Sequence, residues 1–326
     1  MSFKFSMKYI LGIFLTLLLV ASCKKDKSLE AEIAKLNTDI SIERFDERFA
    51  KVTPKTLPDL KNEYPFMFSK TFKDSFWLAK IKDTLQIQLF KEVDKTFSNI
   101  KNTEAEIESL FNHLKYYFSE FNPPRIITTT NDVDYRDRLI VTDTITVIAL
   151  DSYLGSDHEF YGNIANYIKT NFTKDQIVVD LAHEYARKYT YHPGRKTLLD
   201  EMIYFGKLLY FKDMMLPLKK EAERIGYSEN ELNWAIANES YIWRYFVSRE
   251  LLFSTDSKLP SRFINPAPFS KFYIEDVDAD SPGRLGQYIG WQIVRAYMDQ
   301  NDVSLKEMLI KSTEEIFNNT KFKPRK

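Results

Sequence analysis

The chain has 326 residues, of which 44% are hydrophobic, 15% aromatic and 28% charged. Lysine plus arginine and aspartate plus glutamate each number 46, so the formal net charge is zero. The apolar content excludes wholesale disorder, and the balanced charge gives no electrostatic basis for binding nucleic acid. A single cysteine excludes an internal disulfide. The length allows one large domain or two modest ones.

The N-terminal 22 residues have the features of a bacterial export signal. They contain no acidic residue, carry Lys4 and Lys8, and include an uncharged apolar run over residues 9–21. This run is shorter than the roughly 20 residues of a membrane-spanning helix but is typical of a signal-peptide core. It ends in Val20-Ala21-Ser22-Cys23, which resembles the lipobox of bacterial lipoproteins. The alternatives are an ordinary secretory signal, or a first helix with a buried cysteine.

The lipobox resemblance implies that residues 1–22 are a lipoprotein signal peptide and that Cys23 becomes the first residue of the mature chain. Its thiol would carry a diacylglycerol and its new amine an acyl chain such as palmitate. Several acyl chains hold a protein stably on a membrane, whereas one chain is marginal. We therefore expect an anchor in the cell membrane or the outer membrane, with the body facing the periplasm. Residues 23–40 are expected to form a tether, because their apolar residues are too sparse for a core.

Residues 41–326 predict one mostly helical domain with a small β-sheet, of class α+β. The patterns predict helices over about 70–99, 104–119, 174–190, 197–211 and 282–297, one that Ser228 caps with a bend near Glu239, and a last one from Ser304. They predict strands over 125–130, 139–141 and 144–150. Several of these helices begin with a capping signal of the form Ser or Thr followed three residues later by Glu or Gln, as at Thr103 and Ser228. The basic end, residues 321–326, is expected to be a frayed tail.

One predicted helix carries part of a zinc-peptidase motif. The segment His183-Glu184-Tyr185-Ala186-Arg187 matches the first two residues of H-E-x-x-H, in which two histidines one turn apart bind zinc and the glutamate polarises a water. Arg187 stands at the second histidine position, and a guanidinium offers no lone pair to a metal. Asp180, His183, Glu184 and Arg187 fall on the polar side of the helix. That side either lines a cleft or carries surface ion pairs.

The segment from Val178 through Trp291 resembles the gliding-motility lipoprotein B family (GldB) of the Bacteroidota. The stretches that carry the resemblance are His183-Glu184-Tyr185, Leu198 to Tyr210, and Pro282 to Trp291. The resemblance implies a role in cell-surface gliding and in the associated type IX secretion apparatus, with other gliding and secretion proteins of the envelope as partners.

That family in turn resembles predicted zinc peptidases with an H-E-Y-x-H motif and a later E-G-x-A motif, whose glutamate is the third ligand. On this alignment Phe205 stands at the ligand position before Gly206, and Glu201 lies one turn earlier. The resemblance implies a zincin-like scaffold with an incomplete metal site and no cofactor, in which His183, Glu184, Arg187 and Phe205 are vestigial.

Three other patterns allow more than one interpretation. Asp276-Val277-Asp278-Ala279-Asp280 begins like a calcium loop but lacks the glycine and the final glutamate that such a loop needs, which favours an acidic solvated loop. Gly283, Gly286 and Gly290 are spaced to allow another backbone to approach closely; the alternative is a phosphate cradle, which no preceding strand supports. The segment 260–273 is rich in proline and aromatic residues and could be core, or a surface for a partner or ligand. The aromatic residues proposed for that surface are Phe263, Phe269, Phe272 and Tyr273.

The sequence thus favours a non-enzymatic envelope lipoprotein of the gliding machinery that is tethered by Cys23 and docks partner proteins. One alternative is a zinc-dependent peptidase with atypical ligands, His183 and Glu201, and Glu184 as base. The other is a lipoprotein whose former catalytic cleft binds a peptide or a glycan.

Overall fold

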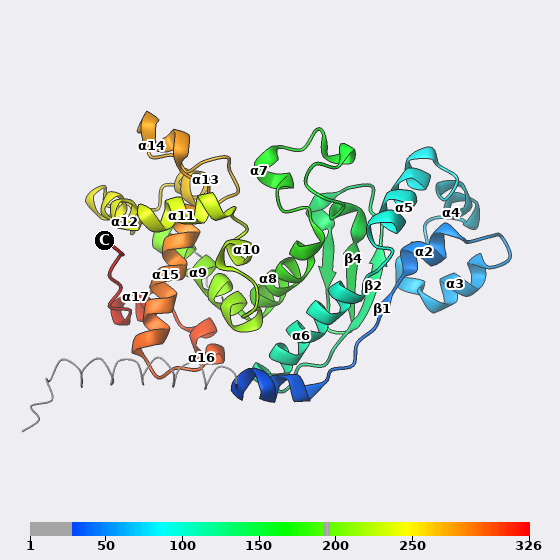
Figure 1. Cartoon of the computed structure of the whole chain (residues 1–326), viewed down its shortest axis with the longest axis horizontal. Coiled ribbons are helices and arrows are strands. Elements are labelled where there is room, and N and C mark those ends of the chain that lie inside the picture. The colour runs from blue at the N-terminus through cyan, green and yellow to red at the C-terminus, as the bar shows by residue number, and fades with distance from the viewer. Residues whose placement is uncertain (1–27, 192–193, 195) are drawn as a thin grey trace, which may run out of the picture.

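A four-stranded mixed sheet lies near the middle of the molecule (Figure 1). Its strands are β1 (Ile42–Glu43), β2 (Arg125–Thr129), β3 (Leu139–Val141) and β4 (Ile145–Ala149), in the order β1-β2-β4-β3. β2 is parallel to both β1 and β4, whereas β3 pairs with β4 as an antiparallel hairpin. The computed structural model describes residues 28–191, 194 and 196–326. The predicted signal peptide, residues 1–22, and Cys23 lie outside these residues.

The N-terminal helices pack on one side of the sheet. They are α2 (Phe45–Ala50), α3 (Leu57–Glu63), α4 (Asp74–Lys80) and α5 (Thr84–Thr96). Their aromatic side chains build a second, smaller core around Phe45, Phe49 and Tyr64. The single helix expected over 70–99 is wrong, because α4 ends at Lys80 and the carboxylate of Asp83 caps a new helix by accepting from the amides of Leu85 and Gln86.

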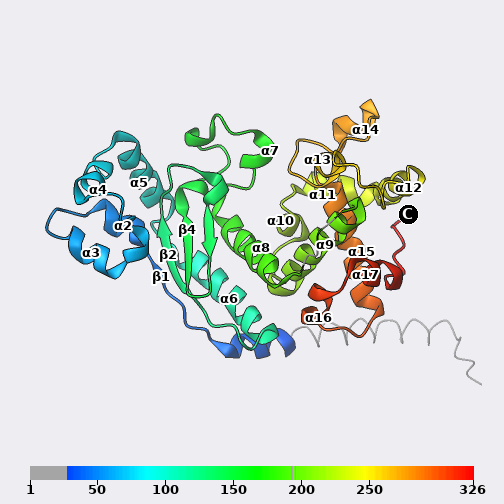
Figure 2. The ribbon, with the colours of Figure 1, turned by 180° about the vertical axis from the view of Figure 1, so that it is seen from behind.

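Three helices lie on or beside the other side of the sheet: α6 (Lys101–Tyr117), α7 (Asn166–Lys169) and α8 (Ile177–Tyr189). Figures 1 and 2 show the sheet between α2–α5 and α8. The apolar stripe of α8 is buried as expected, with Leu181, Ala182 and Tyr185 in the main core. The start expected for α6 is wrong, because the helix begins two residues before Thr103 and has no capping box.

The C-terminal half is helical. It contains α9 (Leu198–Met215), α10 (Glu221–Ile225), α11 (Glu229–Ala237), α12 (Glu239–Ser248), α13 (Leu259–Phe263), α14 (Glu275–Asp280), α15 (Leu285–Gln300), α16 (Leu305–Ile310) and α17 (Thr313–Asn319). The capping box at Ser228 and the break near Glu239 are confirmed. The acidic segment expected as a loop is the short helix α14, and the helix that Ser304 caps is followed by α17.

Helices α9 and α15 form the closest helix pair of the core. A Cβ atom on Gly206 would lie 2.3 Å from the carbonyl oxygen of Gly290, so both backbones touch where neither residue has a side chain. The expectation that Gly290 serves close backbone approach is therefore confirmed. The mostly helical α+β class is also confirmed, and no helix among the described residues is long and apolar enough to cross a membrane.

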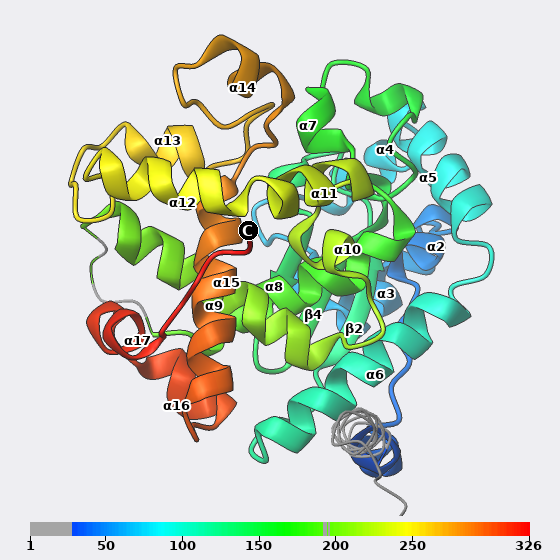
Figure 3. The ribbon, with the colours of Figure 1, turned by 60° about the vertical axis from the view of Figure 1, so that its left-hand side comes forward.

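Both ends of the described chain pack more closely than the sequence indicated. Residues 28–33 are helical, and Ile33 in the expected tether is only 2% exposed. The C-terminal tail is not frayed, since Thr320 is buried and the amide of Arg325 donates to Glu239. Figure 3 shows this tail running along α15 towards α12.

Candidate functional site

A cavity of about 470 Å³ opens beside α8. Asp180 and His183 face it from α8, and Phe205 and Lys212 face it from α9. The segments 167–172, 225–227 and 264–267 supply further walls. Asp180 and His183, on the polar side of α8, therefore line a pocket. The sequence left open whether this side of the helix lines a cleft or carries surface ion pairs, and for these two residues it lines a cleft.

Asp180 is the acidic residue of the cavity that contacts a guanidinium directly. Its carboxylate lies 2.9 Å from Arg138 and accepts a hydrogen bond of 3.0 Å from the hydroxyl of Tyr153. Burial raises the pKa of Asp180, while the charge of Arg138 opposes that shift. Arg138 and Asp180 thus form a largely self-compensated pair in one wall of the pocket.

Lys212 brings a second positive charge to the cavity. It is 7% exposed, and its Nζ donates to the carbonyl oxygen of Arg224 at 3.0 Å. No described carboxylate lies within 4.0 Å of this Nζ, and burial lowers the pKa of Lys212 to about 8. Asp180 and Glu184 of α8 raise that pKa and Arg284 and Arg138 lower it, all from a distance. The group is still mainly a cation at neutral pH, without a counter-ion in contact.

Arg284 supplies a third positive charge. Its backbone is left-handed, with φ of 61°, and its guanidinium donates to the carbonyl oxygens of Ile225 at 2.7 Å and Gly226 at 2.8 Å. It also lies 5.0 Å from the centre of the Tyr227 ring. These contacts fix Arg284 against the end of α10 without neutralising its charge.

His183 is uncharged in this setting. The pKa of its imidazole lies well below the usual value, first because of burial and then because of the charges of Lys212, Arg187, Arg138 and Arg284. A divalent cation would meet the same repulsion. Among the described residues, no group of three His, Cys, Asp or Glu side chains is placed to hold a metal ion. Glu201, the alternative ligand, is not among the residues that line the cavity of His183.

The four residues expected to form a vestigial site are divided between two places. His183 and Phe205 line the same cavity, as the sequence alignment with zinc peptidases implied. Glu184 and Arg187 lie outside it, in a shallow depression with Lys188 and Tyr204, and pair with each other at 3.2 Å. The would-be catalytic base is therefore separated from the His183 cavity and engaged by the residue that replaces the second histidine.

The aromatic partner surface expected over 260–273 is corrected in part. Phe263 and Phe272 are 0% and 4% exposed and belong to the main core, so their rings cannot reach a partner. Phe269 is half-buried. Only Tyr273 of the four is largely exposed, at 73%. Its left-handed backbone is held by the carboxylate of Asp278, which accepts from the amide of Tyr273 at 3.0 Å.

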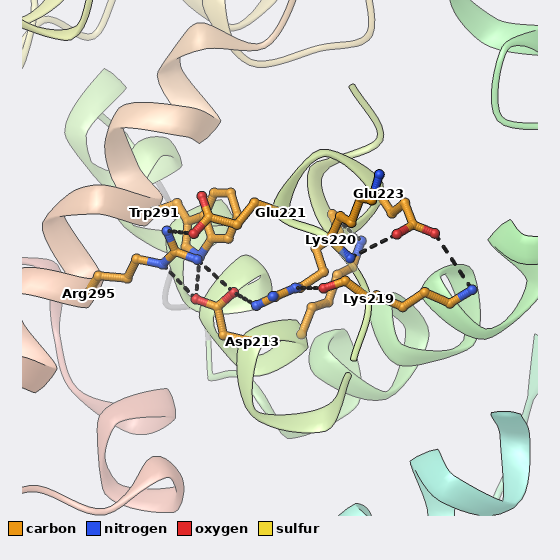
Figure 4. Close-up of polar contacts among 9 residues, drawn as sticks. Asp213, Lys219, Lys220, Glu221, Glu223, Trp291 and Arg295 are labelled. Carbon is orange, nitrogen blue, oxygen red and sulfur yellow. Dashed lines mark hydrogen bonds and ion pairs between the residues drawn. The ribbon is translucent and has the colours of Figure 1, made fainter. Parts of the chain in front are cut away.

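The pocket wall is braced by an ionic network around Asp213 of α9 (Figure 4). The Asp213 carboxylate accepts from Arg295 at 2.7 Å and from the indole nitrogen of Trp291 at 2.8 Å, both on α15. It also pairs with Arg224 of α10 at 2.5 Å. The network joins three helices and fixes α10, which carries the carbonyl acceptor of Lys212.

Sequence reasoning missed the three cations of the pocket. Arg138, Lys212 and Arg284 come from segments far apart in the chain. Arg284 lies in the stretch Pro282 to Trp291 that carried the family resemblance, but no local spacing links it to the other two. The one available sign of the pocket was Lys212, which stands in a helix whose flanking residues are almost all apolar. A charged residue is rarely buried in such a helix without a role.

Together these features define an α+β protein in which a cationic pocket surrounds the histidine of an incomplete zinc-peptidase motif. Residues 26–324 match the model of the family described as gliding motility protein GldB, and the chain belongs to this family of gliding motility lipoproteins. Comparisons with curated proteins and with solved structures gave no match. The family expected from the sequence is confirmed, whereas the zincin-like scaffold stays a prediction.

Proposed function

We propose that this chain is a lipid-anchored, non-catalytic component of the gliding machinery that faces the periplasm and docks other envelope proteins, in connection with type IX secretion. Membership of the gliding motility family supports the setting. The lipobox at Cys23 supports the anchor. The proposed anchor lies in the cell membrane or the outer membrane.

The main support for a non-catalytic role is the positive charge around His183. Four cations lower the pKa of this histidine, and the same charges disfavour a bound Zn²⁺. Glu184 would have to act as general base on a metal-bound water. Instead it pairs with Arg187 outside the cavity. A peptidase that used His183 and Glu201 would have to overcome both arrangements.

The test is complementation of a strain that lacks the gene. Glu184→Gln removes the base but only breaks an exposed ion pair, so the protein should fold normally. We expect colony spreading equal to that given by the wild-type chain, whereas Cys23→Ala, which removes the anchor, should abolish spreading. Loss of spreading with Glu184→Gln at normal protein level would count against a non-catalytic role.

The docking surface is proposed to include Tyr273, the exposed member of the predicted aromatic set. A photo-crosslinking amino acid placed at position 273 in the full chain should give a discrete adduct with another envelope protein in gliding cells. Leu218, which is 88% exposed in the loop after α9, is the matched control. Equal crosslinking from both positions, or none from position 273, would remove Tyr273 from the docking surface.

A further inference from the structure

We propose that the cavity beside α8 binds a carboxylate at the end of a short apolar chain, with Lys212 and Arg284 as the groups that hold the carboxylate. This inference rests on the proposed function in one respect, that the pocket is a binding site and not a catalytic centre. The ligand is either the C-terminus of a peptide or a free apolar acid, because both present the same chemistry.

The charges of the pocket favour an anionic ligand. Its described lining contains three cations, Arg138, Lys212 and Arg284, and two carboxylates, Asp180 and Glu231. Asp180 is paired with Arg138. Glu231 caps its own helix, accepting from the amide of Ser228 at 2.7 Å and from its hydroxyl at 2.9 Å. Among the described residues, Lys212 and Arg284 are therefore left without a carboxylate in contact, and the described lining has an excess of one positive charge.

The burial of Lys212 also favours an anionic ligand. A buried ammonium without a counter-ion costs free energy, and such a group is retained where it has a partner or a function. Lys207, five residues earlier on α9, shows the contrast. It is 3% exposed, and its Nζ donates to the carbonyl oxygens of Leu309 at 3.1 Å and Lys311 at 2.5 Å, away from the cavity. Lys212 lines the cavity and has one carbonyl acceptor in the part of the chain that the structure describes, which leaves two N–H donors for a ligand there.

The size and lining of the cavity favour a small ligand with an apolar stem. A volume of about 470 Å³ lies in the range of small-molecule sites. Much of the remaining wall is apolar, formed by Phe172, Phe205, Leu208, Leu209, Ile225 and Ile264. A single carboxylate matches the one excess positive charge, whereas a phosphate dianion carries a second negative charge and would be repelled more strongly by Asp180. An apolar stem would cover the rest of the wall, and the neutral imidazole of His183 can bond to an amide or hydroxyl of the stem.

The experiment is calorimetric titration of the full chain, purified in detergent, with N-acetyl-alanyl-phenylalanine, its C-terminal amide, 3-phenylpropionate and inorganic phosphate. We expect at least one acid to bind and the amide not to bind. Binding of the peptide acid alone assigns the ligand as a chain end, and tighter binding of phenylpropionate assigns it as a free acid. Failure of both acids to bind, or tighter binding of phosphate, would overturn the proposal.

Two variants on the same helix provide the matched pair. Lys212→Met should weaken binding of the acid by about tenfold or more, because a charge-assisted hydrogen bond is lost. Lys207→Met also removes a buried lysine but should leave the affinity unchanged. Equal effects of the two substitutions would show that Lys212 acts only through folding, and would refute its role. A thermal melt of each variant checks that it is folded.

The titration and a separate analysis of bound zinc distinguish this inference from the proposed function. If no carboxylate binds to a metal-free, folded chain, the proposed ligand is refuted, but the non-catalytic role is not. Zinc bound through His183 refutes the non-catalytic role itself. In the wild-type chain, NMR of the lysine side chains should show the pKa of Lys212 rising from about 8 on addition of the acid, with that of Lys207 unchanged.

Discussion

Gly206 of α9 and Gly290 of α15 meet without any side chain between them. A Cβ atom on Gly290 would lie 1.8 Å from the carbonyl oxygen of Met202, one turn before Gly206. Two helices that together carry Phe205, Lys212, Asp213 and Trp291 are thus held at backbone contact. The position of the pocket wall depends on this contact, because α9 presents Lys212 to the cavity and α15 presents Arg295 to Asp213.

Replacing Gly290 by alanine should therefore be strongly destabilising. The added methyl group cannot be accommodated without separating α9 from α15, and we expect the free energy of unfolding to fall by about 3 kcal/mol. Urea denaturation followed by circular dichroism measures the change. Gly162→Ala is the control, because its Cβ would make only an ordinary contact of 3.4 Å, with Glu159. Similar midpoints for the two variants would argue against backbone contact between the helices.

Asp213→Ala should be nearly as harmful, for an electrostatic reason. The substitution leaves the partly buried guanidiniums of Arg224 and Arg295 without their shared carboxylate. Removing one partner of a buried ion pair costs about 3 kcal/mol or more. The same denaturation experiment measures the loss. Glu120→Ala, which removes an exposed partner of Lys306, should leave the midpoint unchanged, and an equally small effect of Asp213→Ala would contradict the role given to the network.

Asp151 should make the stability depend on pH. Burial raises the pKa of Asp151 to about 6. The amides of Val133 and Asn131 donate to its carboxylate and lower the pKa, but burial has the larger effect. The pKa in the folded chain thus exceeds that of the unfolded chain, which is 3.8. Between these values the folded state binds more protons, so its stability is greatest below the lower pKa and falls as pH rises.

The measurement is the unfolding free energy of the wild-type chain and of Asp151→Asn as a function of pH. From about pH 4 to about pH 6 the wild-type chain should lose about 3 kcal/mol relative to the variant. Above that range the difference should stay constant. Other carboxylates titrate in both proteins and cancel in the difference. Parallel curves for the two proteins would show that Asp151 keeps an ordinary pKa.

The sequence predicted the sheet better than the helix boundaries. Leu139–Val141 was predicted as found, and the expected strands 125–130 and 144–150 exceed β2 and β4 by one or two residues. These strands are marked by β-branched residues between turns, which is a local signal. β1 was missed because a strand of two residues is too short to show an alternating pattern of hydrophobicity. It is a strand only because it pairs with β2, which is distant in the sequence. The helix expected over 70–99 failed because its apolar spacing runs on across Asp83, which caps a second helix.

The candidate site could be predicted only where the signal was local. The motif at His183 pointed to a helix that lines the cavity, and the resemblance to zinc peptidases pointed to Phe205, which lines the same cavity. The cations around His183 were missed because long-range packing, not spacing, brings them together. For the aromatic segment 260–273 the sequence left a core and a surface both open, for the same reason. Phe263 and Phe272 pack against each other at 5.3 Å between ring centres, inside a core that no local pattern reveals.

The most direct test of the whole account is the zinc content of the full chain. The protein is purified in detergent, supplied with zinc, freed of excess metal and analysed for bound zinc, in parallel with His183→Ala. The positive charges around His183 predict that neither protein retains zinc in stoichiometric amount. One zinc ion per wild-type chain that is lost in His183→Ala would contradict the account and make the protein a candidate peptidase.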